Sequence, residues 1–579
     1  MASNDEHAVP DSVSLTQPGD APKLNVQGQN ESDPHVQENY QAENDTEDGS
    51  AASSENVDED EDPLAHFSAV ISAFNLDLLP QFAAKARQKL HPNAACGIPT
   101  VGDPMYGSYH IIYPLTFGDG VQWVIKIPRH GVEGKWDNLS AASLSSEANT
   151  MRLLKRETTI PLPDVFDFST SIYNELGCPY ILTSFISGRP LQEVWFSQLS
   201  GVTDPDALHS HRVRALEGIA SAMAQLGRYT SFVGGAPLFN ANGEWDGLGP
   251  MQVVDVQAEL DRFFIHGDSS SDPIHVEQRS SVDMKWFYTF LMDLHPEPTC
   301  ASSHPKGMKI FLHHLISWFP KPVDPKPFVL THPDFDIQNI LVSEDGQLQG
   351  IIDWEGVAAV PRNTGNEALP SWLTRDWDPM MYRFSKDDFS NNSSNDESSG
   401  NKNFDENGND EESDEDEDED ENEDEDEDDK EEDEYIDDKT SGEPLEDSPE
   451  TLKRYREIYR QCFLDAQAKQ ASFSDRICSL WTRLSNRVSS FFGYPPRLTA
   501  NGDITRQSLI TQNVAIAAMH PACRGGILMK VVEEVSDILG DDVELDFFDI
   551  IEGLAGDELD DSVLENLNSG FEKLLEMSL

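Results

Sequence analysis

Basic residues are scarce in this 579-residue sequence. It holds 41 Lys and Arg against 106 Asp and Glu, which gives a formal net charge of -65. Proteins that bind nucleic acid or an anionic membrane surface directly need faces rich in Lys and Arg, because both partners carry negative charge. The composition therefore argues against direct nucleic-acid binding and against membrane binding.

Long apolar runs and paired cysteines are also lacking. No run approaches the ~20 apolar residues of a membrane-spanning helix. The N-terminal stretch MASNDEHAVPDS has neither the basic start nor the apolar core of a secretory signal peptide. The cysteines form no C-x-x-C pair, which favours reduced thiols over a disulfide framework or a zinc site. We therefore expect an intracellular protein, with the cytoplasm as its location and the nucleus as the alternative. The six cysteines stand at positions 96, 178, 300, 462, 478 and 523.

Two segments have few large apolar residues. Residues 1–62 are rich in Ser, Asn, Gln, Asp and Glu, and residues 386–447 are more extreme. Between Asp405 and Asp438, 26 of 34 residues are acidic against one Lys, which gives that stretch a net charge of -25. Such segments cannot bury enough apolar surface to offset the entropy lost on ordering. Both segments are predicted to be disordered.

A smaller part of the chain favours β-structure. SYHIIYPLTFGDGVQWVIKIP, residues 108–128, has two β-rich runs on either side of Gly118-Asp119-Gly120, which is a strong hairpin signal. A helix is predicted for SSEANTMRLLKRE, residues 145–157. PYILTSFISGRPL, residues 179–191, is typical of a buried strand that leaves through a Gly-Arg-Pro turn. Before these elements, residues 63–92 predict one or two short amphipathic helices.

Most of the remaining sequence favours helices. The pattern is mainly helical over residues 205–320. After the acidic segment, SPETLKRYREIYRQCFLDA begins with Ser448 as the predicted N-cap and Pro449 at the first helical position. This helix places the following side chains on one face: Leu452, Tyr455, Tyr459, Cys462 and Phe463.

The stretch THPDFDIQNILVSEDGQLQGIIDWEG, residues 331–356, carries the chemistry. An apolar run begins at Asn339, a turn lies near Gly346, and a second apolar run ends at Asp353. In a hairpin centred near Gly346, Asn339 and Asp353 fall opposite each other, at about 4.5–5.5 Å between their Cα atoms. A carboxamide oxygen and a carboxylate at that separation can share one Mg²⁺ ion, which prefers oxygen ligands.

Asp334 lies five residues before Asn339, in the loop that leads into the predicted hairpin. From that loop a carboxylate can accept a proton from an attacking hydroxyl without binding the metal. An Asp–x–x–x–x–Asn spacing followed by a metal-binding Asp is the arrangement described for kinases. The alternative for Asp334 taken alone is a turn-capping side chain, but the triple at this spacing favours a phosphotransferase.

A second pair of residues supports the same chemistry. Lys126 ends the apolar strand WVIKIP, where an ammonium needs a partner if it is buried. Glu147, on the following helix, is the predicted partner. In kinases such a Lys holds the nucleotide phosphates of ATP and the Glu orients it. The alternative is a Lys that extends from the strand end into water.

These segments together resemble the aminoglycoside phosphotransferase family, kinase-like enzymes that act on small molecules. The resemblance is carried by HPDFDIQNILVSEDGQLQGIIDWEG, WVIKIP, SEANTMRLLKRETTIPLPDVFDF, PYILTSFISGRPL and LPSWLTRDWDPMMY, in the same order along the chain. It spans about residues 95–385 and resumes at SPETLKRYREIYRQCF.

The resemblance implies an α+β, protein-kinase-like bilobal fold that uses ATP and Mg²⁺. Asp334 becomes the catalytic base, Asn339 and Asp353 the metal ligands, and Lys126 with Glu147 the phosphate-clamping pair. The backbone around Ser184 and Ile186 becomes the adenine-binding hinge, and Gly107 and Ser108 the tip of the phosphate-covering loop. The domains are then residues 1–62, a disordered acidic segment; 63–94, a helical lead-in; 95–188, a β-rich N-lobe; 189–385, a helical C-lobe; 386–447, a disordered acidic insertion; and 448–579, the C-terminal helices.

Three features depart from the family pattern. Pro333 replaces the Gly of the usual His-Gly-Asp, which fixes φ and removes an N–H. The metal segment reads Asp-Trp-Glu-Gly, and the phosphate loop VGDPMYGSYH is no G-x-G-x-x-G. No Ala-Pro-Glu segment or phosphorylatable activation loop follows Asp353, which argues against a conventional protein kinase.

The sequence therefore predicts an ATP- and Mg²⁺-dependent phosphotransferase that acts on a hydroxyl group of an unidentified small molecule. Two alternatives stay open: a weak or inactive kinase-like binding protein that uses its acidic segments for interactions, and an atypical protein kinase. The acidic insertion is predicted to be a solvated spacer. The alternative, because it lies close to the region that forms the substrate side in the resembled family, is that it attracts cationic substrates or basic protein partners within a Debye length of about 8 Å.

Overall fold

The computed structural model describes residues 64–92, 97–268, 272–295, 303–322, 324–380, 382–384, 445–481, 504–540, 543 and 545–577, with only the backbone for 471–481. The chain divides into two units, residues 1–61 and 62–579. All described residues belong to the second unit. The predicted disorder of 1–62 and of 386–444 therefore lies outside the described residues.

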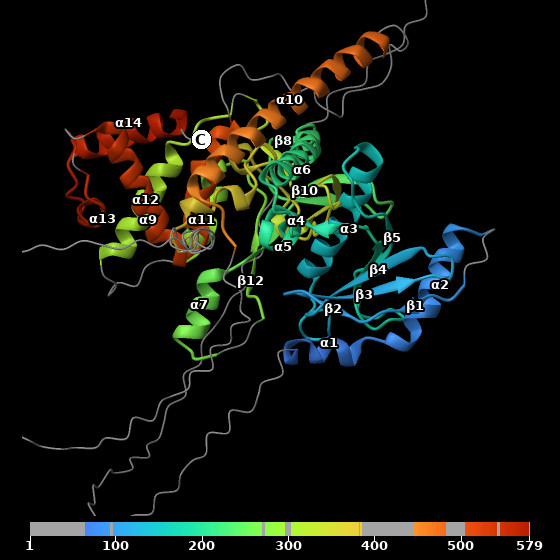
Figure 1. Cartoon of the computed structure of the whole chain (residues 1–579). Helices are drawn as coiled ribbons and strands as arrows, with labels where there is room; N and C mark the ends of the chain where they lie inside the picture. Colours follow the sequence, from blue (N-terminus) through green and yellow to red (C-terminus); the bar gives the residue numbers. More distant parts are fainter. Residues whose placement is uncertain are drawn as a thin grey trace, which may run out of the picture. The chain divides into compact units, whose positions relative to one another are not determined.

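The N-terminal part of the second unit is a six-stranded antiparallel sheet with the order β1-β3-β4-β6-β5 and β2 on β3 (Figure 1). The predicted hairpin is confirmed: β3 pairs with β4 from Thr116 opposite Gln122. Gly120 lies in the turn with a positive φ of 85°, a conformation that favours glycine. The strands are β1 (Thr100–Val101), β2 (Met105–Tyr106), β3 (His110–Thr116), β4 (Gln122–Pro128), β5 (Val165–Ser169) and β6 (Tyr180–Ser184).

The two faces of this sheet have different partners. Alternation along β4 sends Trp123, Ile125 and Ile127 to one face, where they join a hydrophobic cluster with the lead-in helices. The lead-in predicted for 63–92 is confirmed as η1 (Ala65–Phe67), α1 (Ser68–Ala73), η2 (Leu76–Leu78) and α2 (Leu79–Leu90). Among the described residues no single helix is long and apolar enough to span a membrane, although α1 and α2 with their flanking turns pass that length-and-composition test as a pair bent by 54°.

The opposite face of the sheet carries Lys126 and helix α3 (Asn138–Glu157). The helix begins seven residues before the predicted start at 145, because the carboxylate of Asp137 accepts a hydrogen bond from the backbone N–H of Ser140 and caps it. Its C-terminal half is tied to the β5 edge: the Arg152 guanidinium donates to the carbonyl of Val165, and the Lys155 ammonium to that of Leu162. Glu147 lies midway along the helix.

Residues 185–188 connect the sheet to the helical part. Arg189 and Pro190, predicted as a turn, form instead the short strand β7 (Arg189–Pro190). It pairs with β14 (Ile340–Val342), a strand of the motif hairpin. Gly188 allows this close approach, because a Cβ there would lie 3.2 Å from Leu341. Helices α4 (Leu191–Trp195) and α5 (Ser197–Ser200) follow.

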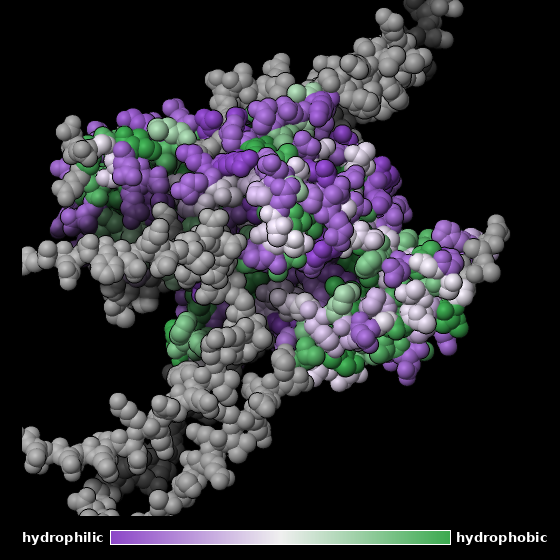
Figure 2. Space-filling model, in the orientation of Figure 1, coloured by the Kyte–Doolittle hydropathy of each residue, from purple (hydrophilic) through white to green (hydrophobic). Residues whose placement is uncertain are grey.

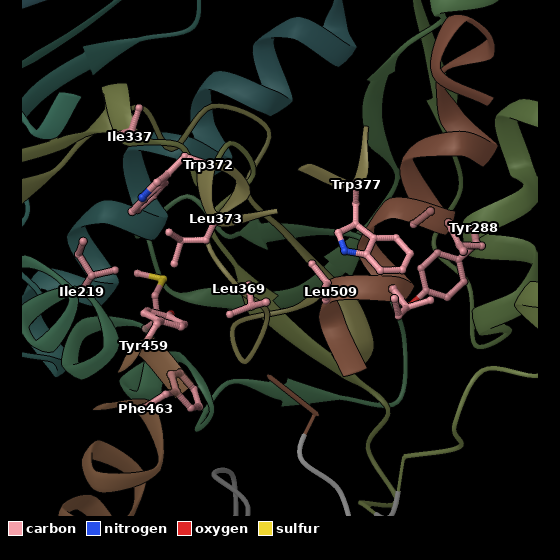
Figure 3. Close-up of a cluster of buried hydrophobic side chains, with 14 of the residues drawn as sticks. Ile219, Tyr288, Ile337, Leu369, Trp372, Leu373, Trp377, Tyr459, Phe463 and Leu509 are labelled. Atoms are coloured by element: carbon pink, nitrogen blue, oxygen red, sulfur yellow. The ribbon is translucent and has the colours of Figure 1, made fainter. Parts of the chain in front are cut away.

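The helical part surrounds one large hydrophobic core. Figure 3 shows part of it, where Trp372, Leu373 and Trp377 come from the segment after the motif hairpin and Tyr459 and Phe463 from α10. The cap of α10 is as predicted, since the Ser448 hydroxyl accepts from the N–H of Thr451. On the face drawn in Figure 2, hydrophilic residues cover α6 and α10. The helices are α6 (Pro205–Leu226), α8 (Met284–Leu294), α9 (Ser303–Ser317), α10 (Pro449–Trp481), α11 (Ile504–Met519), α12 (Pro521–Leu539), α13 (Phe547–Gly556) and α14 (Asp561–Met577).

The prediction of mainly helical structure over residues 205–320 is wrong between α6 and α8. That region holds two antiparallel hairpin pairs, β9 with β10 and β11 with β12, and helix α7 between β11 and β12. These strands are only four or five residues long, and strands that short give weak alternation in the sequence. Their bounds are β8 (Thr230–Ser231), β9 (Ala236–Phe239), β10 (Trp245–Gly249), β11 (Met251–Val254), α7 (Val256–Phe264) and β12 (His275–Gln278).

The last two residues of the acidic insertion, Glu446 and Asp447, are held by contacts with the helical part. The Asp447 carboxylate accepts from the Trp195 indole at 2.6 Å and pairs with Arg212 at 3.1 Å. Glu446 pairs with Arg375 at 2.9 Å, and the Tyr382 hydroxyl donates to the carbonyl of Asp447 at 2.8 Å. The predicted disorder up to residue 447 is therefore wrong for 446 and 447, because Arg375 and Arg212 form ion pairs with their carboxylates.

Candidate active site

The motif hairpin forms, but in a different register from the predicted one. Strand β14 (Ile340–Val342) pairs with β15 (Leu348–Ile351), with Ile340 opposite Ile351. Asn339 accepts a hydrogen bond from the N–H of Ile352 and therefore lies opposite Ile352, not Asp353. The predicted Asn339–Asp353 pairing is wrong by one residue, because the turn closes between Ser343 and Gln347 and is centred on Asp345 instead of Gly346; the irregularity between Leu341 and Val342 makes up only one of the two residues of offset.

Asp353 leaves the hairpin in an unusual backbone conformation. Its φ is 63°, in the left-handed region that non-glycine residues rarely adopt. Such conformations cluster at functional sites, where surrounding contacts hold them in place. Here the carboxylate oxygen Oδ1 accepts from Lys126 Nζ at 2.7 Å. Burial opposes ionisation of Asp353, but the Lys126 ammonium outweighs it and lowers the pKa to about 2.

Lys126 joins the two halves of the site. Its ammonium lies 3.0 Å from Glu147 Oε1, so the predicted ion pair is formed, and 2.7 Å from Asp353. Burial alone would lower the pKa of the ammonium, but the carboxylates of Glu147 and Asp353 outweigh it and raise the pKa. Burial raises the pKa of Glu147, against the pull of Lys126. Lys126 is therefore a charged group held between two elements, not a side chain that extends into water.

Asp334 is exposed in the loop before the hairpin, and Asn339 holds it. The Asn339 amide donates to Asp334 Oδ2 at 2.8 Å and to the Asp334 carbonyl at 3.0 Å. This orientation turns the amide nitrogen of Asn339 toward Asp334 and the amide oxygen away from it. The loop is braced further by Ser371, which donates to the carbonyl of Phe335 at 3.0 Å, and by Asp336, which caps η3 (Ile337–Asn339).

His332 and Pro333, which precede Asp334, connect this loop to the segment around Asp353. The buried His332 ring lies 2.9 Å from the carbonyl of Ile352 through Nε2 and edge-on to Trp354 at 4.7 Å between centroids. Burial lowers the pKa of His332, so the ring is neutral near pH 7 and donates to that carbonyl. Pro333 is exposed and lies next to Gly356, where a Cβ would be in ordinary van der Waals contact with it at 3.7 Å. The loop thus accommodates the proline that departs from the family pattern.

Glu355 and His110, which the sequence analysis did not predict, lie near Lys126. Glu355 Oε2 lies 4.0 Å from Lys126 Nζ and 3.2 Å from His110 Nε2. His110 faces the same side of the sheet as Lys126, since its register partner is Pro128, two residues further along β4. Burial, followed by the charge of Lys126, lowers the pKa of His110 well below its usual value. The period-two alternation of β3 was the signal that pointed to His110.

The predicted hinge and phosphate loop lie where strands end. Ser184 closes β6 opposite Trp123, and Ile186 packs in the connection to the helical part, close to Gly350. Gly107 and Ser108 form the turn between β2 and β3, where the Gly107 N–H donates to the carbonyl of His110 at 2.9 Å. Their roles in binding ATP stay predictions.

The described residues hold no cluster of three or more His, Cys, Asp or Glu side chains that could bind a metal by themselves. Mg²⁺ in kinase sites needs only one or two carboxylates, because waters and phosphate oxygens complete its shell. Asp353 fits this role: it is ionised, its side chain is 42% exposed, and Lys126 contacts only one of its oxygens. Asn339 fits as well, because its amide oxygen points away from Asp334.

The enclosed space beside Lys126 is small. A cavity of about 10 Å³ is lined by His110, His130, Glu147 and Gln252, among others, and has room for about one water molecule. A larger cavity of about 580 Å³ lies elsewhere, between the end of α3, α6 and α10, and none of the predicted site residues lines it. Neither of these two cavities is lined by Asp334 or Asp353, so they do not locate the predicted chemistry.

The topology, more than any single residue, defines the class. An antiparallel sheet with a helix across one face is joined by a short connection to a helical part. The strand lysine meets the helix glutamate, and the aspartate of the later hairpin meets the same lysine. This arrangement is the protein-kinase-like bilobal fold.

Comparison with a family model supports this assignment. The model described as "Phosphotransferase enzyme family" matches residues 293–361. That range contains Asp334, Asn339 and Asp353, and the match confirms the predicted resemblance to the aminoglycoside phosphotransferase family.

Curated relatives carry a name that points to an organelle. "Altered inheritance of mitochondria protein 9, mitochondrial" from Candida tropicalis is 36% identical over 15% of this chain and 14% of the relative. The protein of the same name from Eremothecium gossypii is 23% identical over 48% of this chain and 51% of the relative. The match thus spans about half of the relative at most. These names contradict the predicted cytoplasmic or nuclear location, and that prediction is wrong.

Comparison with solved structures gives matches of low similarity. An amicoumacin kinase in complex with AMP-PNP and Ca²⁺ is 13% identical, with 56% of this chain and 75% of that chain covered and a TM-score of 0.28. An aminoglycoside phosphotransferase from Streptomyces rimosus is 15% identical, with 52% and 86% covered and a TM-score of 0.27. The fold assignment therefore depends on the topology and contacts described above.

Proposed function

We propose that this protein is an ATP- and Mg²⁺-dependent phosphotransferase that transfers a phosphoryl group to a hydroxyl of a small molecule. One observation carries the proposal: Lys126 Nζ lies 3.0 Å from Glu147 and 2.7 Å from Asp353. The sheet strand β4, helix α3 and the end of the motif hairpin therefore meet at one ammonium. A buried ammonium between two carboxylates has no packing advantage over an apolar residue. A nucleotide-phosphate site gives this arrangement a use.

The residues then have distinct roles. ATP with Mg²⁺ supplies the phosphoryl group and neutralises part of its charge when bound. Lys126 holds the phosphates, with Glu147 fixing its direction. Asp353 and Asn339 would hold the metal. Asp334 is exposed, and Asn339 orients its carboxylate to accept the proton of the attacking hydroxyl. Most of the acceleration would come from positioning and from charge stabilisation at the site.

We also propose a mitochondrial location, on the names of the relatives from Candida tropicalis and Eremothecium gossypii. Protease protection of the tagged chain in isolated organelles tests this. A tag protected in mitochondria supports the proposal, and a tag found wholly outside mitochondria contradicts it.

The attraction of basic protein partners to the acidic segment stays a proposal. Its support is composition, the net charge of -25 between Asp405 and Asp438. A pull-down at two salt concentrations, with the full chain beside a chain lacking 390–444, measures it. Basic partners retained equally by both chains would leave the segment as a spacer.

The proposed activity is tested by measuring ADP release against a panel of small-molecule hydroxyl compounds, together with ATP binding with and without Mg²⁺. Release that depends on one class of hydroxyl supports the proposal. ATP binding without turnover would indicate the inactive binding protein, and phosphorylated protein product would indicate an atypical protein kinase.

A further inference from the structure

Residues 235–268 and 272–280 form a hairpin region whose two ends lie side by side. We refer to this hairpin region below as the insertion, as distinct from the acidic segment. Gly234 and Ser281 exchange two backbone hydrogen bonds, of 2.8 and 3.1 Å, where the segment leaves and returns. The next residue, Gly235, exchanges two more with Ala359 of β16 (Ala358–Pro361). The insertion is therefore attached directly behind the Asp353-Trp354-Glu355-Gly356 segment of the site.

From these two ends the hairpins reach the N-terminal half of α3. A small cavity is lined on one side by α3 residues spaced three or four apart and on the other by β9, Pro250 and β11, with Gly356 at its edge. The α3 residues are small apart from the first, which lets strands approach the helix closely. In the turn between β9 and β10, a Cβ on Gly243 would lie 3.2 Å from the Asn149 amide oxygen. The α3 residues at this contact are Leu139, Ala142, Ser143 and Ser146.

An ion pair joins the same two regions. Lys135 lies three residues before the start of α3, and its ammonium donates to Asp272 Oδ2 at 2.6 Å. Arg129, at the end of the sheet strand, lies 4.0 Å from the other oxygen of Asp272. The Arg262 guanidinium of α7 donates to the Asp272 carbonyl at 2.6 Å and so fixes Asp272 within the insertion.

The insertion also reaches the lysine itself. Gln252 of β11 lines the small cavity that Lys126, Glu147 and Glu355 share. The ring of His275 on β12 lies 6.1 Å from that of His130, which lines the same cavity.

The two halves of α3 are thus held by different parts of the chain. The C-terminal half is tied to the sheet edge through Arg152 and Lys155. The N-terminal half faces the insertion, and Glu147 stands at the junction. Because a helix moves as a stiff rod, the position of its N-terminal half sets where the Glu147 carboxylate meets Lys126.

We propose that the insertion 235–280 is a built-in clamp on α3, and that Asp272 and Lys135 are positioning residues for the Lys126–Glu147 pair. The catalytic consequence rests on the proposed phosphotransferase function; the mechanical consequence does not. The clamp keeps Glu147 against Lys126 without a partner protein or a modified loop.

Hydrogen exchange of α3 amides and the Kd of Mg·ATP, measured on the full chain, test the clamp. The variants are Asp272→Asn, Lys135→Met and the double variant. The matched control is Glu175→Gln, which removes a surface ion pair to Lys85 at 3.4 Å within the N-terminal part, remote from the α3–insertion contact. Both clamp side chains are partly exposed, so we expect effects the size of a surface ion pair.

Each single variant is expected to speed exchange at residues 139–147 and to raise the Kd of Mg·ATP by about two- to fivefold. The double variant is expected to match Asp272→Asn, because Lys135 acts through Asp272, which also lies close to Arg129, and Glu175→Gln should change neither readout. Unchanged α3 exchange in Asp272→Asn, or fully additive single effects, would overturn the clamp. If the chain binds no ATP, the proposed function fails, while α3 exchange still decides the clamp.

Discussion

The candidate site has two halves, the Lys126–Glu147 pair and the Asp334 loop, which hold their charged groups in different ways. Lys126 and Glu147 are largely buried, with side chains 17% and 5% exposed, and each depends on the other for its charge. Asp334 is exposed, and its Oδ2 accepts from the side-chain amides of Asn339 at 2.8 Å and of Gln338 at 3.5 Å. Removing a partner from a buried pair leaves a charge without compensation, whereas removing an exposed carboxylate does not. Stability and function should therefore be coupled in the first half and separable in the second.

The largest expected effect is on the exposed half. Asp334→Ala should lower kcat by a factor of about 10²–10⁴, the range for a positioned acid–base group. The Kd of Mg·ATP and the urea midpoint should stay close to those of the parent, because the buried Asn339 amide keeps its hydrogen bond to the backbone carbonyl of residue 334. Single-turnover kinetics with an accepted hydroxyl compound measures the first, and a parent-like rate would remove Asp334 from the mechanism.

The buried half should respond in both properties at once. Glu147→Gln replaces a charge-assisted hydrogen bond by a neutral one, so we expect a loss of about 1–3 kcal/mol in the free energy of unfolding and about tenfold weaker Mg·ATP binding. Glu193→Gln is the matched control, since it loosens an exposed pair with Arg189 at 2.8 Å. Urea unfolding and calorimetry report the two quantities. Weakened binding at parent stability would break the contrast between the halves.

Asp353 links the halves and should show it in metal and pH dependence. Asp353→Asn should remove most of the Mg²⁺ enhancement of ATP binding, which calorimetry with and without Mg²⁺ measures. Equal enhancement in both proteins would remove Asp353 from the metal site.

The same residue gives the fold an acid-sensitive contribution. The folded-state pKa of Asp353 is lowered to about 2, so its ionised form stabilises the fold above pH ~4 and this contribution is lost as the pH falls toward ~2. Urea midpoints at several pH values should therefore show that the parent loses more stability than Asp353→Asn over this window. Parallel loss in the two proteins would contradict the assigned shift.

The smallest effect is expected from removal of the acidic segment. Deleting residues 390–444 should leave the Kd of Mg·ATP within about twofold, because Tyr382 and Asp447 already hold the two ends of the segment together and loop length changes closure entropy only slowly. Calorimetry on the deleted chain checks this. A large loss of ATP binding would mean that the segment takes part in the nucleotide site.

Much of the site was predictable because its signals are local. Lys126 is visible as a charge in an apolar strand, and Glu147 lies on the next helix in the sequence. The spacing of Asp334 and Asn339 places both in one loop. The register of the motif hairpin was not predictable, because it depends on the turn closing between Ser343 and Gln347 and on the irregularity at Leu341 and Val342, neither of which the spacing reveals.

The missed features are contacts between distant segments. Glu355 and His110 meet through the fold, and no spacing in the sequence connects them. The hairpins that reach α3 are short strands with many turn residues, so neither their pairing nor their contact with Ser146 follows from periodicity. The fold class follows from the order of elements, whereas the clamp on α3 appears only in three dimensions.

The central claim is that this protein transfers a phosphoryl group from ATP to a hydroxyl and that Asp334 is the catalytic base. The most direct measurement is ADP release by the parent and by Asp334→Ala across a panel of hydroxyl compounds, at saturating Mg·ATP. We predict that at least one compound class accelerates release by the parent and that Asp334→Ala loses this acceleration while still binding Mg·ATP. Acceleration that is equal in both proteins, or absent across the panel in a parent that binds Mg·ATP, would contradict the account.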